Sequence, residues 1–237
     1  MATPLRLQLM RWHIWLGWLA GVPILLWMVS GLFMVAQPIE NIRGMHLRAE
    51  IPAVSLGGVE PVVPRIDSAV RAVEKVTLEQ RPGGPIWLIR YADGGGRRAS
   101  VETGAYLAPQ LSGDEAARIA RAAYTGDGAF GGVTRIAADA NPLELRHDRP
   151  AWRATFGSGT HVYVDAETGD VLALRTGLWR AFDLMWGLHI MDLGGREDTS
   201  HPILIVAAIL SLLMVLLGAI ILPWRYIRKN RRQRAKR

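Results

Sequence analysis

Two long stretches of the chain contain no charged residue, and they lie near its two ends. The first covers residues 12–39 and the second covers residues 202–224. Each is longer than the roughly 20 residues that a helix needs to cross the apolar core of a bilayer. Helices in the core of a soluble protein rarely run uncharged for so long. The pattern therefore predicts two transmembrane helices, over 12–37 and 202–224.

The first stretch could also be a cleaved signal peptide, because basic residues precede it. However, its apolar run exceeds the roughly 7–15 residues of a signal-peptide core. The best exit site, residues 34–36, lacks a small residue three positions before the cut. We therefore expect a retained anchor. Its Gly17 and Gly21 have the Gly-x-x-x-Gly spacing that lets a second helix approach closely.

Between the two stretches the sequence repeats itself at an offset of 65 residues. The matching pairs are Pro85 with Pro150, Trp87 with Trp152, Gly94 with Gly159, and the triplet 102–104 with 167–169. Each copy predicts a strand, a Gly-rich turn, a strand, a tight turn and a short strand. Thr-Gly in the tight turn suits a position with positive φ.

A helix is predicted before each copy, over residues 66–76 and 114–124. Ser112 and Glu115 form a capping-box pattern at the start of the second helix. Each repeat is then a helix packed on an antiparallel sheet. The fold class is an α+β membrane protein in which two transmembrane helices flank a domain of two α+β repeats.

The remaining segments complete the predicted organisation. Apolar residues recur at helical spacing over 178–193, which predicts an amphipathic helix at the membrane surface. Gly194-Gly195 then breaks this helix. The segments in order are 1–11 (N-terminal start), 12–37 (first span), 38–63 (linker), 64–111 and 112–177 (repeats), 178–193 (interfacial helix), 202–224 (second span) and 225–237 (basic tail).

The charge of the chain locates its ends. The formal net charge is +7. The charged residues before the first span and after the second span are all basic, and the region between the spans has a small excess of acidic residues. Basic residues that flank spans stay in the cytoplasm, which predicts two cytoplasmic termini. The basic tail should attract anionic lipid rather than nucleic acid. The chain has no cysteine, which excludes disulfides, thiolate metal ligands and cysteine nucleophiles.

With these features the chain resembles the PepSY-associated transmembrane-helix family. The resemblance rests on short motifs in the same order: residues 11–13, Gly17 and 30–32 in the first span, 162–172 in the second repeat, Leu188-His189, and 217–225 at the end of the second span. It implies a bacterial inner-membrane protein with a periplasmic domain of two PepSY-like repeats. Some longer members, with four spans, resemble ferric-siderophore reductases that carry haem b. This chain has only two spans, which puts a complete electron path in one chain in doubt.

The histidines are the candidates for a redox centre, because haem b needs axial imidazoles near an apolar bundle. His13, His189 and His201 lie beside apolar helices and are the candidate cofactor-binding residues. His13 and His201 should lie at opposite ends of the spans, about 30 Å apart. His189 and His201 could therefore face an outer haem, and two copies of His13 an inner haem in a dimer. Alternatively, all three are interfacial histidines bonded to water or headgroups.

One acidic turn raises the question of a metal site. Asp165, Glu167 and Asp170 crowd the tight turn of the second repeat, but turn chemistry explains these residue types equally well. The first repeat has Ser100, Glu102 and Ala105 at the matching positions. We therefore assign no metal to the turn.

Three functions remain open from the sequence. The first is a membrane-anchored binding or accessory module, linked through the resemblance to envelope iron and siderophore uptake. The second is a haem-b subunit that reduces ferric siderophores. The third is a regulator of a periplasmic protease, because PepSY units also occur in protease propeptides. The expected partners are the lipid bilayer and either a second copy of the chain or another membrane protein, and no nucleic acid. Whether the chain is an enzyme stays open.

Overall fold

The computed structural model describes residues 4–66 and 68–234, without the side chains of Arg6 and of residues 224–234. The predicted basic tail over 225–237 therefore has its side chains outside the described residues. The chain divides into two compact units, Pro38–Arg180 and the pair of end segments Met1–Gln37 and Ala181–Arg237.

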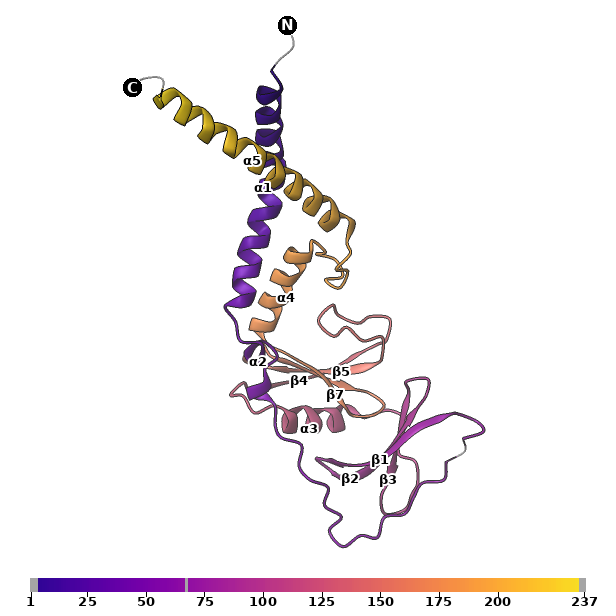
Figure 1. Ribbon diagram of the computed structural model, residues 1–237. Helices are drawn as coiled ribbons and strands as arrows, with labels where there is room; N and C mark the ends of the chain where they lie inside the picture. Colours follow the sequence, from indigo (N-terminus) through magenta and orange to yellow (C-terminus); the bar gives the residue numbers. More distant parts are fainter. Residues whose placement is uncertain (1–3, 67, 235–237) are drawn as a thin grey trace. The chain divides into compact units, whose positions relative to one another are not determined.

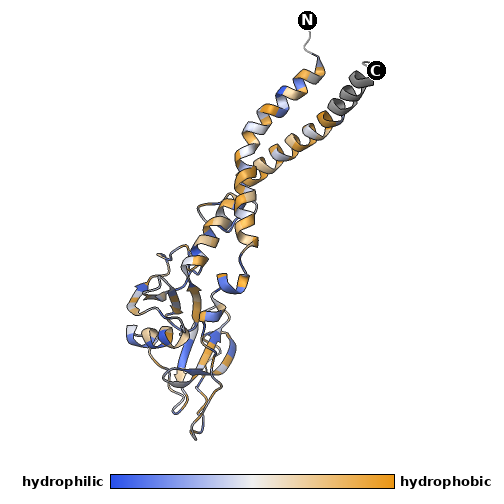
Figure 2. Cartoon of the chain, turned by 90° about the vertical axis from the view of Figure 1, so that its left-hand side faces the viewer, coloured by the Kyte–Doolittle hydropathy of each residue, from blue (hydrophilic) through white to orange (hydrophobic). Residues whose placement is uncertain are grey.

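The end segments form a helical unit (Figure 1). It consists of α1 (Leu5–Val35), α5 (Pro202–Arg234) and most of α4 (Gly177–Ile190). α1 and α5 are long and apolar enough to cross a membrane, over Leu7–Val35 and Pro202–Pro223 (Figure 2). α1 begins at Leu5, before the predicted span, because the residues that follow Pro4 are strong helix formers.

Small residues line the contact between α1 and α5. Ala20 on α1 is fully buried, and Ala207 and Ser211 on α5 are at most 9% exposed. The large apolar side chains of both helices point outward instead, as expected for surfaces that face lipid. Close approach of helices through small residues is the usual way in which helices pack in a bilayer.

The domain of residues 38–180 contains two antiparallel sheets (Figure 1). The first repeat forms β1 (Val73–Arg81), β2 (Gly84–Tyr91) and β3 (Gly96–Ser100). The second forms α3 (Gly113–Ala123), β4 (Phe130–Ile136), β5 (Ala151–Phe156), β6 (His161–Asp165) and β7 (Val171–Arg175). Both sheets pair their strands in chain order, and α3 packs on the second sheet.

The predicted repeat is confirmed at the level of single residues. β3 and β6 occupy positions that differ by the predicted offset at both ends. The glycines of the first turn, Gly94 and Gly159, have φ of 82° and 73°, and those of the second turn, Gly104 and Gly169, have φ of 69° and 79°. Only glycine takes these conformations without strain, which is why the turn glycines recur.

The helix predicted over residues 66–76 is wrong. Residues 68–71 form turns, and β1 begins at Val73. Ile66, Val73 and Val76 do pack against the buried cluster of Ile89 and Tyr91, so their apolar spacing has the expected role of covering the sheet. They do so from a loop and a strand, because pairing along β2 outweighs a local helical pattern.

The other predicted helix is confirmed, whereas the predicted linker is more ordered than its sequence pattern indicates. The Ser112 side chain accepts a hydrogen bond from the Glu115 amide, and the Glu115 side chain accepts one from the Ser112 amide, which confirms the capping box. The first part of the predicted linker contains α2 (Ile39–Ile42) and the short helix η1 (Met45–Leu47). Leu47 packs against the main core of the second repeat, so this segment is part of the domain.

Candidate functional site

The acidic turn of the second repeat is held by arginines. Asp170 accepts hydrogen bonds from Arg81 at 2.7 Å and from Arg90 at 2.8 Å, and both arginines lie on the first sheet. Burial raises the pKa of Asp170, but the hydrogen bonds and the positive charges of Arg90 and Arg81 together outweigh burial and hold the pKa below its ordinary value. Asp170, one of the acids that suggested a metal, therefore joins the second repeat to the first sheet.

Two further arginines contribute to this joint between the repeats, which is the set of contacts between the first sheet and the acidic turn of the second repeat. Arg149 lies 3.1 Å from both the Asp165 and the Glu167 carboxylates of its own repeat, and it donates a hydrogen bond to the Gly94 carbonyl of the first repeat. Arg98 is 5% exposed and donates to the Glu167 carbonyl, to the Ala108 carbonyl and to the carboxylate of Glu115. These three side-chain hydrogen bonds of Arg98 connect β3 to segments that follow it in the chain. The two repeats therefore share one charged interface.

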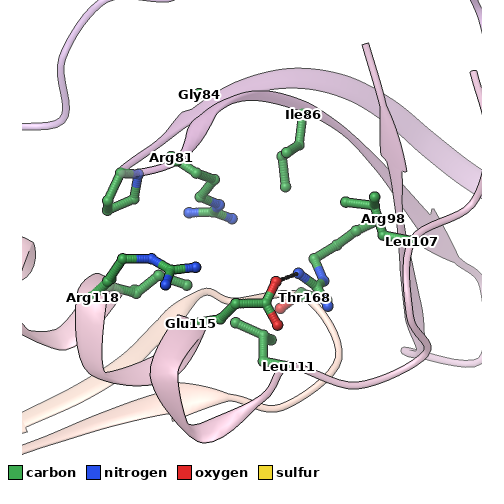
Figure 3. Close-up of a pocket in the computed structure, with 12 residues that line it drawn as sticks. Arg81, Gly84, Ile86, Arg98, Leu107, Leu111, Glu115, Arg118 and Thr168 are labelled. Atoms are coloured by element: carbon green, nitrogen blue, oxygen red, sulfur yellow. Dashed lines mark hydrogen bonds and ion pairs between the residues drawn. The ribbon is translucent and has the colours of Figure 1, made fainter. Parts of the chain in front are cut away.

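A cavity of about 200 Å³ lies beside this interface (Figure 3). The β1–β2 hairpin, β3 and α3 form its walls. Its apolar lining consists of Ile86, Leu107, Leu111 and Ile119. Its charged lining consists of Arg81, Arg98, Glu115 and Arg118. A cavity with apolar walls and a few fixed polar groups is the usual form of a small-ligand site.

A second polar centre surrounds Glu144, between β6 and the start of α4. The Glu144 carboxylate accepts hydrogen bonds from His161 and Tyr163, both at 2.5 Å, and from Arg180 at 3.1 Å. Burial raises the pKa of Glu144, but the bonds from Tyr163, His161 and Arg180 together outweigh it and hold the pKa below its ordinary value. Burial and the bond to Glu144 raise the pKa of Tyr163. The sequence pattern did not reveal this centre.

His13 lies between the two long helices. Its Nδ1 is 3.1 Å from the carbonyl oxygen of Met214 on α5. Its ring rests on Gly218, where an added Cβ would lie 3.1 Å from His13 Cε1. No described residue hydrogen-bonds to its Nε2. Gly17, one helical turn further along, faces Met214, so one member of the Gly-x-x-x-Gly pair already contacts α5 of the same chain.

His189 on α4 is held against α1 in a similar way. Its Nδ1 is 3.0 Å from the Ser30 hydroxyl, and its carbonyl accepts a hydrogen bond from Trp27 at 2.6 Å. An added Cβ at Gly31 would lie 3.4 Å from its ring. Ser30 is only 1% exposed. The contact therefore joins a buried hydroxyl to the imidazole.

His13 and His189 do not share one site. His13 and Ser30 lie 17 residues apart on α1, so the rings of His13 and His189 are separated by about 25 Å along the helix. His201 precedes α5, and its Nδ1 is buried without a hydrogen-bond partner among the described residues. Of the remaining histidines, His161 belongs to the Glu144 centre.

Comparison with known proteins gives one family match. The family model of the PepSY-associated TM region matches residues 10–237, which is nearly the whole chain. No curated protein and no solved structure matches it. The matched region includes both long apolar helices and both sheets.

Proposed function

Because the chain belongs to the family defined by the PepSY-associated TM region, we propose that it is a membrane-anchored binding module of the bacterial inner membrane. Both termini lie in the cytoplasm and the two-repeat domain lies in the periplasm. The basic residues that flank both spans support this orientation. The family match is to a membrane protein, and the two spans hold the domain at the bilayer.

The observation that carries the binding role is the cavity between the two repeats. Its walls come from both repeats, and two of its arginines, Arg81 and Arg98, are fixed by bonds that also join the repeats. Side chains held in this way are positioned before a ligand arrives, which lowers the ordering cost of binding. The link to envelope iron uptake rests on the resemblance to longer, siderophore-related members.

Growth of a deletion strain tests this function. We expect the wild-type gene to restore growth on a ferric siderophore as sole iron source. Ile86→Trp fills the cavity and should leave growth at the level of the deletion strain. Arg43→Gln, at an exposed arginine outside the cavity, should restore growth fully. The triple variant His13→Ala, His189→Ala, His201→Ala should also restore growth if binding is the function. Full growth with a folded Ile86→Trp protein would contradict the proposal.

A second function, electron transfer through haem b, is favoured by the contacts of His13 and His189. Metal-bound histidines usually have one ring nitrogen fixed by a hydrogen bond, which leaves the other for the metal. Nδ1 of His13 and Nδ1 of His189 are fixed in this way. Haem would supply a one-electron carrier, and His13 and His189 would each hold such a group at a different level of α1. A second copy of the chain or another protein would complete each site, because two helices cannot enclose the group.

Absorption spectra of the detergent-purified chain, oxidised and dithionite-reduced, test this alternative. If haem binds, a Soret band and sharp reduced bands should appear and should weaken in His13→Ala and in His189→Ala. His147→Ala, at an exposed position of the domain, is the control and should leave the spectrum unchanged. A folded, colourless protein after expression with ample haem would rule out haem binding by this chain alone.

A further inference from the structure

We propose that the cavity between the repeats takes a carboxylate attached to a small apolar group, and that Arg118 and Arg81 receive the carboxylate. This inference rests on the proposed binding function and names the ligand class of the same site. It follows from the charge balance, the direction of the side chains and the size of the cavity.

The charge balance leaves one arginine uncompensated. Glu115, the acid that lines the cavity, already accepts from Arg98 at 3.1 Å and from Ser112. Arg118 makes no ion pair with any acid among the described residues. It lies on α3, one helical turn after Glu115, and contributes a positive charge at the cavity.

Arg81 adds hydrogen-bond donors on the opposite wall. It shares Glu79 and Asp170 with Arg90, so this group of four side chains is neutral as a whole. Its Nε is nevertheless buried without a partner. Figure 3 shows the guanidinium groups of Arg81 and Arg118 directed toward the same space, from the hairpin and from α3. The planar guanidinium matches a carboxylate in geometry and charge. The Arg81 side chain is 19% exposed, and its partial removal from water strengthens such a bond.

The rest of the cavity suits a small apolar group. Ile86 points into the space from above, and Leu111 lies below it (Figure 3). The volume of about 200 Å³ corresponds to about seven waters, which is enough for one branched side chain. Gly83 and Gly84 at the hairpin have open space where a Cβ would stand, so the rim there is free of side chains.

Such a carboxylate has two sources. It is either the C-terminus of a polypeptide that ends in an apolar residue, or a free branched-chain carboxylic acid. Both present the same two features to the cavity, and they differ only in the amide chain that precedes the last residue.

Calorimetric titration of the full chain in detergent separates the two sources. The probes are a tripeptide ending in leucine with a free carboxylate, isocaproate, and the amides of both. The acids should bind at least about tenfold more tightly than their amides, because the amide has no charge for Arg118 to receive. Tighter binding of the tripeptide acid would identify a polypeptide end, and tighter binding of isocaproate would identify a free acid.

Variants locate the effect. Arg118→Gln should weaken binding of the preferred acid at least about tenfold, whereas Arg43→Gln should leave it unchanged. Ile86→Trp should abolish it. Unfolding midpoints of each variant establish that the chain is folded. Equal binding of acid and amide, wild-type binding in Arg118→Gln, or no heat with either acid at millimolar concentration would overturn the ligand class. If Ile86→Trp still fails to support growth in that case, the binding function stands and the ligand is of another class.

Discussion

Glu144→Leu should lower the unfolding free energy of the domain by about 3 kcal/mol, because it removes the shared acceptor of a largely buried polar centre. Tyr163 is fully buried, and the Glu144 side chain is 13% exposed. Without the carboxylate, the Tyr163 hydroxyl loses the acceptor that it now contacts at 2.5 Å. Arg180 is 36% exposed, so its share of the loss is reduced by solvent screening.

Urea unfolding of the full chain, followed by near-ultraviolet circular dichroism, measures this loss. Glu144→Gln is the matched control, since an amide oxygen still accepts from Tyr163 and only the charge is lost. We expect a smaller destabilisation from Gln than from Leu. Equal stability of the wild type and Glu144→Leu would show that the centre contributes nothing to the fold.

The pH dependence of the same variants has a definite sign. Contacts with Tyr163, His161 and Arg180 lower the pKa of Glu144 in the folded state from its ordinary value of 4.5. The carboxylate therefore contributes stability above pH 4.5, and this contribution disappears as the pH falls through the lowered folded-state value. The stability difference between the wild type and Glu144→Gln should narrow over this acidic range. A difference that stays constant down to full protonation would contradict the assignment.

Gly218→Leu should weaken the pairing of the two long helices by about 2 to 3 kcal/mol, through overpacking and the loss of one hydrogen bond between helices. A Cβ added at this position would lie 3.1 Å from the His13 ring, and a leucine side chain needs the space that the ring occupies. The ring would have to leave its contact with the Met214 carbonyl.

Unfolding of the chain in detergent by titration with sodium dodecyl sulfate measures this effect. Gly21→Leu is the matched control, because nothing lies within 4 Å of a Cβ at Gly21. The control adds the same side chain to the same helix pair, on a surface that faces outward. If both variants unfold at the same detergent fraction, the contact between His13 and Gly218 does not hold the helices together.

The sequence predicted the features that recur along the chain. The charge-free stretches predicted α1 and α5, because a membrane-spanning helix can be recognised from the length and composition of its own sequence. The 65-residue offset predicted the paired strands and the turn glycines, because each copy is built from local contacts. The prediction of a helix over 66–76 was wrong, because Val73 and Val76 belong to a strand that pairs with β2. A local sequence pattern does not reveal that pairing.

The candidate sites were harder to predict, because their members come together only in the folded domain. Arg81 and Asp170 are 89 residues apart, and Glu144 and Arg180 are 36 apart. The repeat did place Asp170 in a turn, but nothing local to it indicated that arginines from the first copy would surround it. The histidines near the spans were visible as residue types, whereas their hydrogen bonds to Met214 and Ser30 depended on how the helices pack.

The joint between the repeats also fixes an order of events during synthesis. Arg81 and Arg90 emerge long before Asp170, and translation at about 5–20 residues per second leaves roughly 4 to 18 s between Arg81 and its partner. Throughout that interval Arg81 and Arg90 have Glu79 but lack Asp170, and residues 68–100 contain no helix to cover the sheet. The nascent first repeat is therefore open to proteases during this interval, and its protection begins when the turn of the second repeat arrives.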